Sequence, residues 1–157
     1  MQIIADDLAS PEVAALLQRH HDGMLANSPR DSCHVLDLNA LRSPDIAFWT
    51  AWDGLDLAGC GALKTLNSAH GEIKSMRTHD DHLRKGVGAA ILTHIIAQAK
   101  ARGMAQLSLE TGSSPPFQPA LDLYTRFGFR YCPPFGDYRE DPCSRFMTLD
   151  LIAARGD

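Results

Sequence analysis

Two glycines, Gly86 and Gly88, stand directly after Arg84 and Lys85 and open a long segment with helical apolar spacing. Glycine permits a tight turn and a close approach of the backbone to a ligand. A helix that begins here directs its unpaired N–H groups and the positive end of its dipole toward that turn. Such a helix end binds phosphate, and the two cations add charge for an anion. The segment therefore predicts a phosphate-bearing cofactor held at a helix N-terminus.

The same segment excludes two common phosphate-binding loops. A dinucleotide-binding fingerprint needs a third glycine three residues after the second, and Ile91 stands there. A Walker loop needs Gly-Lys followed by serine or threonine, which is also missing here. The expected cofactor is therefore bound by neither a dinucleotide-binding fingerprint nor a Walker loop.

Apolar periodicity and turn residues predict a single α+β domain over residues 1–157. Ser10-Pro11-Glu12 is a typical helix start, and Asp53-Gly54 indicates a hairpin. The adjacent His20 and His21 are expected to be solvated helix residues. We expect strands at 1–5, 46–52, 55–66, 73–78, 105–110, 129–132 and 146–151, with helices from residue 11, at 38–41, from residue 87 and at 117–127.

Two spaced motifs resemble the GNAT superfamily of acyl-CoA-dependent N-acetyltransferases, in its small stand-alone bacterial form. Residues 83–88 are similar to its pyrophosphate loop, Gln/Arg-x-x-Gly-x-Gly/Ala, although Leu83 stands where glutamine or arginine is expected. Residues 120–129 resemble its Ala-x-x-x-Tyr-x-x-x-Gly-Phe helix and strand, and residues 72–78 take the place of its cofactor-facing strand. The likeness covers roughly residues 71–132, and two motifs in register are more specific than either alone.

This resemblance implies a fold and a cofactor. The fold is a GNAT-like mixed, mostly antiparallel sheet of about six to seven strands, flanked by helices and splayed in the middle to admit the cofactor. The cofactor is acetyl-CoA, used as a co-substrate, and no metal is expected. The implied phosphate-binding residues are Arg84, Lys85, Gly86, Val87, Gly88 and Ala89, chiefly through backbone N–H groups, and the implied carbonyl-polarising strand contains Met76, Arg77 and Thr78.

Acyl transfer from a thioester to an amine requires a polarised carbonyl, a protonated leaving thiolate and a neutral amine. Tyr124 matches the catalytic tyrosine of the family, and its phenol has a reference pKa above that of a thiol, so it can act as the general acid. Glu72 and Glu110 are the two candidates for the general base, and they remain alternatives. The asparagine expected seven residues before the tyrosine is replaced by Phe117, and the neighbouring Gln118 is a candidate substitute.

Composition limits the possible partners and the compartment. The net charge of −4 argues against general nucleic-acid binding, and no apolar run reaches the length of a membrane span. The first residues lack the basic region and cleavage site of an export signal, so a cytoplasmic location is expected. The cysteines show no Cys-x-x-Cys spacing, which favours reduced thiols over a disulfide or zinc framework.

These observations predict an N-acetyltransferase that moves an acetyl group to a primary amine, in a small molecule first and in a peptide second, by direct attack in a ternary complex. The alternative is a non-catalytic acyl-CoA-binding regulatory module, which would need the phosphate loop but no acid. The long loop at 133–142 is a candidate for acceptor recognition, because loops on rigid scaffolds often carry specificity. The sequence does not decide whether the protein forms a homodimer.

Overall fold

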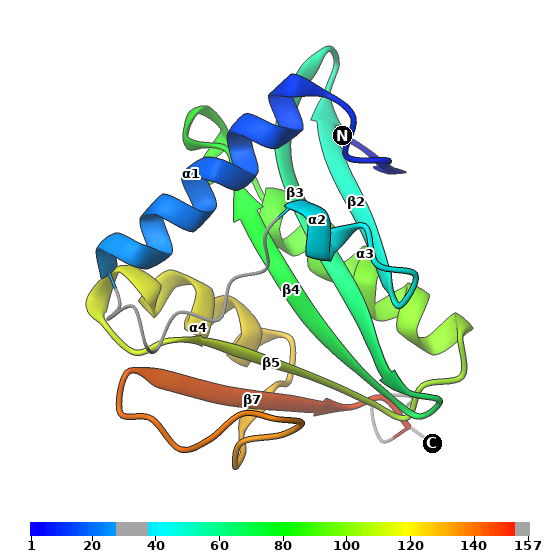
Figure 1. Cartoon of the computed structure of the whole chain (residues 1–157), viewed down its shortest axis with the longest axis vertical. Coiled ribbons are helices and arrows are strands. Elements are labelled where there is room, and N and C mark those ends of the chain that lie inside the picture. The colour runs from blue at the N-terminus through cyan, green and yellow to red at the C-terminus, as the bar shows by residue number, and fades with distance from the viewer. Residues whose placement is uncertain (28–37, 153–157) are drawn as a thin grey trace.

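The computed structural model describes residues 1–27 and 38–152. Seven strands form one sheet, namely β1 (Gln2–Ala5), β2 (Ile46–Asp53), β3 (Asp56–Asn67), β4 (His70–Thr78), β5 (Gln106–Gly112), β6 (Arg130–Tyr131) and β7 (Ser144–Asp150). Their spatial order is β1-β2-β3-β4-β5-β7-β6 (Figure 1). Among the strands of the described residues, only β4 and β5 are parallel neighbours, so the expectation of a mixed, mostly antiparallel sheet of six to seven strands is confirmed.

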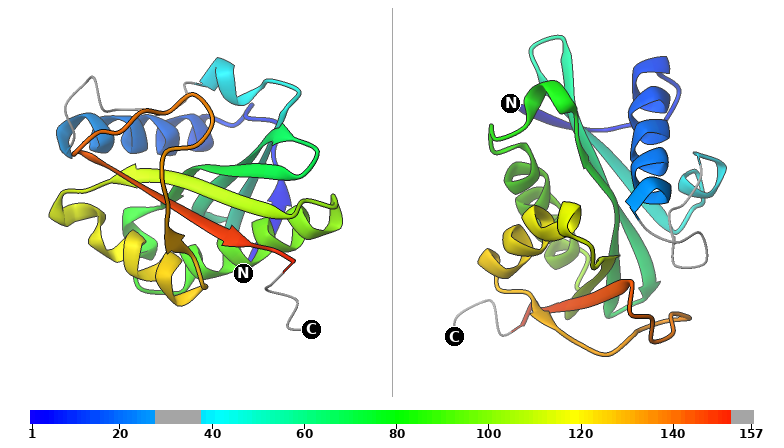
Figure 2. Two further views of the ribbon diagram at one scale, coloured as in Figure 1. Left: turned by 90° about the horizontal axis from the view of Figure 1, so that it is seen from below. Right: turned by 90° about the vertical axis from the view of Figure 1, so that its left-hand side faces the viewer.

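Helices cover both faces of this sheet. In the right-hand view of Figure 2, α1 and α2 lie on one side of the strands, and α3 and α4 lie on the other. Within residues 1–27 and 38–152 the α-helices are α1 (Pro11–Asn27), α2 (Leu38–Leu41), α3 (Val87–Ala101) and α4 (Gln118–Arg126). The 3-10 helices η2 (Asp80–His82) and η3 (Pro115–Phe117) precede α3 and α4.

Local sequence explains where these elements begin and end. The Ser10 hydroxyl accepts a hydrogen bond from the backbone N–H of Glu12 at 3.2 Å, which caps α1 as its sequence predicts. Gly54 at the β2–β3 turn and Gly103 after α3 have φ of 62° and 78°. Those conformations are costly for residues with a Cβ atom, so glycine ends the two elements there.

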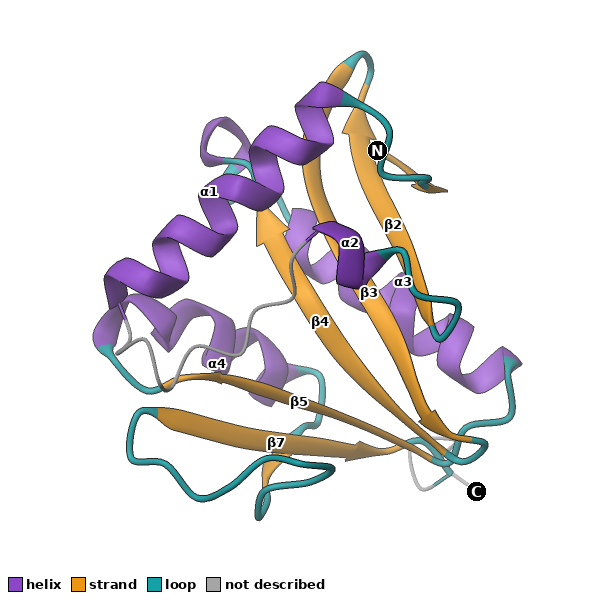
Figure 3. Cartoon of the chain, in the orientation of Figure 1, coloured by secondary structure: helices purple, strands orange, loops and turns teal. Residues whose placement is uncertain are grey.

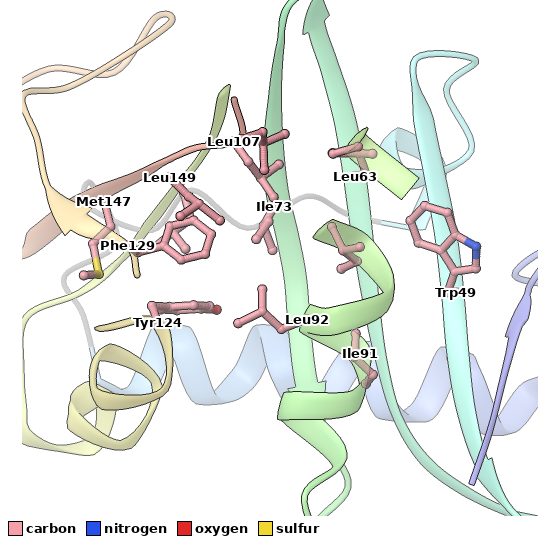
Figure 4. Packing of buried hydrophobic residues seen from close by; sticks show 14 of the residues in the cluster. Trp49, Leu63, Ile73, Ile91, Leu92, Leu107, Tyr124, Phe129, Met147 and Leu149 are labelled. Atoms are coloured by element: carbon pink, nitrogen blue, oxygen red, sulfur yellow. The ribbon is translucent and has the colours of Figure 1, made fainter. Parts of the chain in front are cut away.

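Two layers of apolar side chains hold the helices to the sheet. One packs α1 and α2 against β2 and β3 and includes Val13, Leu16 and Phe48. The larger layer joins α3 and α4 to the opposite face of the sheet. Figure 4 shows part of it, with Tyr124 and Phe129 at one end and Trp49 at the other. The sheet is therefore buried on both faces, which fixes the helices around its centre.

The parallel pair opens along its length. Its ladder joins residues 70–73 of β4 to residues 106–109 of β5, from His70↔Gln106 to Ile73↔Leu109. Beyond this ladder the two strands fan apart toward their C-terminal ends, as Figures 1 and 3 show. The predicted splay in the middle of the sheet is therefore present, and it separates the C-terminal half of β4 from β5.

A β-bulge marks the point where β4 turns away. Cys60 of β3 pairs with Arg77, whereas Ala62 pairs with Lys74, so two residues of β4 oppose one of β3. Ser75, inside the bulge, has φ of 56°. The thiol of Cys60 donates to the Ser75 carbonyl at 3.3 Å, and burial raises the pKa of this thiol to about 12. Cys60 therefore stays protonated and supports the bulge.

The described cysteines Cys60, Cys132 and Cys143 are free thiols, as expected, and Cys33 lies outside the described residues. In the part of the chain that the structure describes, no helix is both long and apolar enough to span a membrane.

Gly59 of β3 lies where β4 and α3 approach so closely that no side chain fits. A Cβ atom built at Gly59 would lie 2.7 Å from the Arg77 carbonyl oxygen and 2.8 Å from Val87 Cγ1. We expect Gly59→Ala to lower the free energy of unfolding by about 1–3 kcal/mol, the usual cost of overpacking a well-packed core. Urea unfolding followed by tryptophan fluorescence measures this change.

Gly23→Ala is the matched control, because the added Cβ atom in helix α1 would meet only Arg77 Nη1, at 3.4 Å. Alanine is a better helix former than glycine, so this control should keep or slightly raise stability. Equal stability of the two variants would contradict the close approach at Gly59.

Candidate active site

A narrow hollow of about 60 Å³ lies where β4 and β5 separate. We call it the neck; residues 72–76 of β4 and 109–111 of β5 line it, together with His20, Met24 and Tyr124. The opening exists because the parallel ladder ends at Ile73 and Leu109, so the neck follows directly from the splay and the bulge.

A larger hollow adjoins the neck at each end. The α3-side hollow, of about 490 Å³, is bounded by Thr78, Gly88 and Leu123 and shares Met76 and Tyr124 with the neck. The loop-side hollow, of about 520 Å³, is bounded by Lys64, Leu66 and residues 136–141 of the β6–β7 loop, and it shares Glu72 and Lys74 with the neck. The neck therefore shares lining residues with two larger hollows, each large enough for part of a reactant.

Tyr124 lies where the neck meets the α3-side hollow. Helix α4 carries it, and its ring packs edge-to-face on Phe129 with centroids 5.7 Å apart. The side chain is 6 % exposed, and burial raises the pKa of its phenol above the usual value. Tyr124 is therefore a protonated donor at neutral pH, in a position rigidly set by the core.

Glu72 lies where the neck meets the loop-side hollow, in a hydrogen-bonded group with Lys74 and the partly buried Tyr138. The side chains of Glu72 and Lys74 are only 4 % and 9 % exposed. Lys74 Nζ donates to Glu72 Oε2 at 3.0 Å and to the Tyr138 hydroxyl at 2.9 Å. The Tyr138 hydroxyl donates to the same Glu72 oxygen at 2.5 Å. Burial, followed by the negative charge of Glu72, raises the pKa of Tyr138, so this phenol remains a donor.

Glu110, the second candidate base, also lines the neck, from the β5 side. The structure thus brings Tyr124, Glu72 and Glu110 around one opening, although the sequence places them on three different elements. Of the two carboxylates, only Glu72 lines the loop-side hollow as well. Glu72 is therefore the carboxylate that a molecule entering from the β6–β7 loop meets.

The glycine motif forms the start of α3. Gly86 precedes the helix with φ of 80°, a conformation that favours glycine, and Arg84 also has a positive φ, of 63°. Gly88 lines the α3-side hollow, and Leu123 Cδ2 would lie 3.1 Å from a Cβ atom there. Val87 buries its side chain in the core. Of the motif residues, Val87 therefore offers only its main chain to a ligand.

The cations near this motif face different spaces. Arg77 lines the α3-side hollow, and its guanidinium donates to Asp80 Oδ1 at 3.3 Å. Lys85 lines a separate hollow beside α1, together with Arg19 and His79. Among these cations, Arg77 is the one that the structure places beside the other candidate cofactor-binding residues Met76, Thr78 and Gly88.

His20 is a site residue that the sequence interpretation missed. It lines both the neck and the α3-side hollow and is partly buried, so the expectation of a solvated side chain is wrong. Desolvation, aided by the positive charge of Arg77, lowers the pKa of His20 to about 4, so the ring is neutral at physiological pH. The sequence does contain a signal for this position of His20, because the residue continues the buried stripe of Val13, Leu16 and Leu17 at helical spacing.

The structure also places Phe117 and Gln118. Phe117 lines the α3-side hollow, and its ring covers Gly112 so closely that a Cβ atom there would lie 2.2 Å from Phe117 Cε2. Gln118 is exposed and donates to Asp122 Oδ1 at 2.8 Å. Gln118 therefore does not contribute to this hollow, and an apolar ring stands where the family motif has an amide.

Comparison with known proteins agrees with this geometry. Residues 12–129, three quarters of the chain, match the model of the acetyltransferase (GNAT) family. The chain belongs to this GNAT family. The chain is 56 % identical to the uncharacterized N-acetyltransferase YsnE of Bacillus subtilis, over 96 % of this chain and 100 % of that protein. It is 50 % identical to the uncharacterized N-acetyltransferase YedL of Escherichia coli, over 95 % and 94 % of the two chains.

Solved GNAT structures share the fold. An acyl-CoA N-acyltransferase structure from Klebsiella pneumoniae superposes with a TM-score of 0.81 at 27 % identity, covering 96 % of this chain and 97 % of that one. A GNAT acetyltransferase from Elizabethkingia anophelis, solved with acetyl-CoA bound, superposes with a TM-score of 0.65 at 20 % identity, covering 95 % and 97 %. This GNAT protein is therefore an acyltransferase by family, and it shares its overall fold with both structures.

Proposed function

We propose that the protein transfers an acetyl group from acetyl-CoA to a primary amine of a small molecule, by direct attack while both reactants are bound. The observation that carries this proposal is the neck, where Tyr124, Glu72 and Glu110 meet between two larger hollows. In this proposal, the two reactants occupy the two larger hollows and their reacting atoms meet at the neck. The small volume of the neck, about 60 Å³, suits the reacting atoms alone.

The α3-side hollow fits a phosphate-bearing thioester. The first N–H groups of α3 are available for phosphate, and Gly88 leaves the helix start uncovered. The rest of the hollow is lined largely by apolar side chains such as Phe117 and Leu123, which suit an uncharged arm. Bound acetyl-CoA would supply the activated acyl group. In this proposal, residues 84–89 hold its phosphates, and main-chain groups at residues 76–78, which lie beyond the β4–β5 ladder, polarise its carbonyl.

Two side chains carry out the proton transfers of the proposed reaction, one as a base and one as an acid. Glu72 takes one proton from the acceptor ammonium, so that the neutral nitrogen attacks, and later releases that proton to solvent. The bond from nitrogen to the acyl carbon forms as the bond from that carbon to sulfur breaks. Tyr124 protonates the leaving sulfur, and the second proton lost by the nitrogen restores the phenol. Glu110 is the alternative base.

Two measurements test this function. Calorimetry should detect binding of coenzyme A, and a thiol-release assay with acetyl-CoA should detect turnover with amino acids, polyamines, aminoglycosides or peptides. Absence of coenzyme A binding would overturn the proposal. Binding without thiol release across this panel would instead indicate the non-catalytic acyl-CoA-binding alternative.

A substitution at Gly88 tests the cofactor site. We expect Gly88→Val to weaken coenzyme A binding about tenfold or more, because a branched side chain 3.1 Å from Leu123 crowds the start of α3. Titration calorimetry measures the change. Ala97→Val, on the exposed face of the same helix, is the control and should bind coenzyme A as the wild type does. Equal affinity of both variants would contradict a phosphate site at Gly88.

A further inference from the structure

Tyr138 lines the loop-side hollow, and its hydroxyl contacts the part of the lining that this hollow shares with the neck. Tyr138 comes from the loop between β6 and β7, and its ring packs against Phe135 and Phe146, with centroids 5.1 and 5.5 Å away. Its hydroxyl lies between Glu72 and Lys74, the two residues that the loop-side hollow shares with the neck. A molecule that binds Glu72 and Lys74 from this hollow therefore competes with this hydroxyl.

The bonds of the hydroxyl define what can replace it. Lys74 can only donate, so the Tyr138 oxygen accepts from the ammonium at 2.9 Å, and its single proton goes to Glu72 at 2.5 Å. A replacement must offer Glu72 a donor and Lys74 an acceptor in the same small space. A simple amine satisfies Glu72 but leaves the buried ammonium of Lys74 with one partner fewer, which is costly for a desolvated charge.

We propose that the acceptor is an α-amino carboxylate, whose ammonium binds Glu72 and whose carboxylate binds Lys74 when it displaces the Tyr138 hydroxyl. This inference rests on the proposed acetyl transfer and narrows its acceptor. An α-amino acid carries a donor cation and an acceptor anion on one carbon atom, which matches the adjacent carboxylate and ammonium of Glu72 and Lys74, 3.0 Å apart. The nitrogen then lies beside the base, on the side of the neck that faces Tyr124.

The rest of the loop-side hollow agrees with a small dipolar acceptor. Its described lining combines three cationic and four acidic side chains, whereas a polyamine or aminoglycoside would be better matched by acidic groups alone. Its volume of about 520 Å³ leaves room for the side chain of an amino acid. Charge and size therefore both favour an acceptor with one amine and one carboxylate.

Matched acceptors test this inference. The standard L-α-amino acids, their carboxamides and the corresponding decarboxylated amines are compared by kcat/KM in the thiol-release assay. We expect each reactive amino acid to exceed its carboxamide by about 10- to 100-fold, the range for one hydrogen bond between charged groups. Calorimetric titration of the same amino acids into the protein saturated with coenzyme A measures binding independently of turnover.

Lys74→Met identifies the residue responsible. We expect the ratio of kcat/KM between amino acid and carboxamide to fall to about unity in this variant, mainly through loss of the amino-acid activity. Lys100→Met, which removes a cation of α3 outside the lining of the loop-side hollow, is the control and should keep the wild-type ratio. The ratio is the decisive quantity because Lys74 also contacts Glu72, so absolute rates can change for both acceptors.

Three results would overturn the inference. They are a wild-type ratio near unity, an unchanged ratio in Lys74→Met, and coenzyme A binding with neither binding nor acetylation of any amino acid. Acetylation of the decarboxylated amines alone would overturn the inference while leaving the proposed acetyl transfer intact. Failure to bind coenzyme A would remove the proposed function itself.

Discussion

Replacing Tyr124 by phenylalanine is expected to lower kcat by about 10²- to 10⁴-fold, the usual contribution of a positioned general acid. The variant keeps the ring that packs on Phe129 and loses only the hydroxyl at the neck, so affinity for coenzyme A and stability should change little. Steady-state thiol release and calorimetry measure the two quantities. Wild-type turnover in this variant would remove the acid role of Tyr124.

Tyr131→Phe is the matched control, since Tyr131 is 59 % exposed on β6 and outside the neck. The pH profile adds a second check on Tyr124. Burial raises the pKa of Tyr124 above its usual value near 10, so the acid stays protonated as pH rises through the ordinary tyrosine range. Loss of Tyr124 protonation should therefore cause no decline of kcat below about pH 10.

Glu72→Gln is expected to lower kcat/KM by about 10²-fold or more, because the acceptor ammonium loses its proton acceptor. The same change should lower the free energy of unfolding by about 3 kcal/mol, because the nearly buried ammonium of Lys74 loses its carboxylate partner. Thiol-release kinetics and urea unfolding measure these effects. Glu12→Gln, which changes an exposed carboxylate in the first turn of α1 outside the neck and both adjoining hollows, should leave both near wild type.

The double variant Glu72→Gln with Lys74→Met separates the two effects. Removing the unpaired ammonium should restore most of the stability, because a buried pair replaced by uncharged groups costs little. Catalysis should not return, because the base is still missing. Recovery of activity together with stability would show that Glu72 acts only through the fold.

Glu110→Gln decides between the two carboxylates. Only Glu72 lies where the loop-side hollow meets the neck, so the larger loss of activity should follow its substitution. A larger loss in Glu110→Gln would assign the base to β5 instead.

Much of the fold was predictable because its signals are local. The capped start of α1 at Ser10, the glycine turn at Gly54 and the glycine after α3 each depend on a few neighbouring residues. Apolar periodicity also indicated the buried faces of α1 and α3. These signals predicted the strands and helices to within a few residues, and the two spaced motifs predicted the GNAT family.

The sequence by itself determined the glycine turn before α3 and the position of Tyr124 in the motif at residues 120–129. Both depend only on residue types and spacings that can be read directly from the sequence. Only the tertiary structure decided that Glu72, Lys74 and Tyr138 share one hydrogen-bonded group, although 64 residues or more separate the tyrosine from the other two. It also decided that His20 faces the neck. Such contacts arise from the packing of distant elements around the splayed strands, and no local pattern specifies which side chains will meet there.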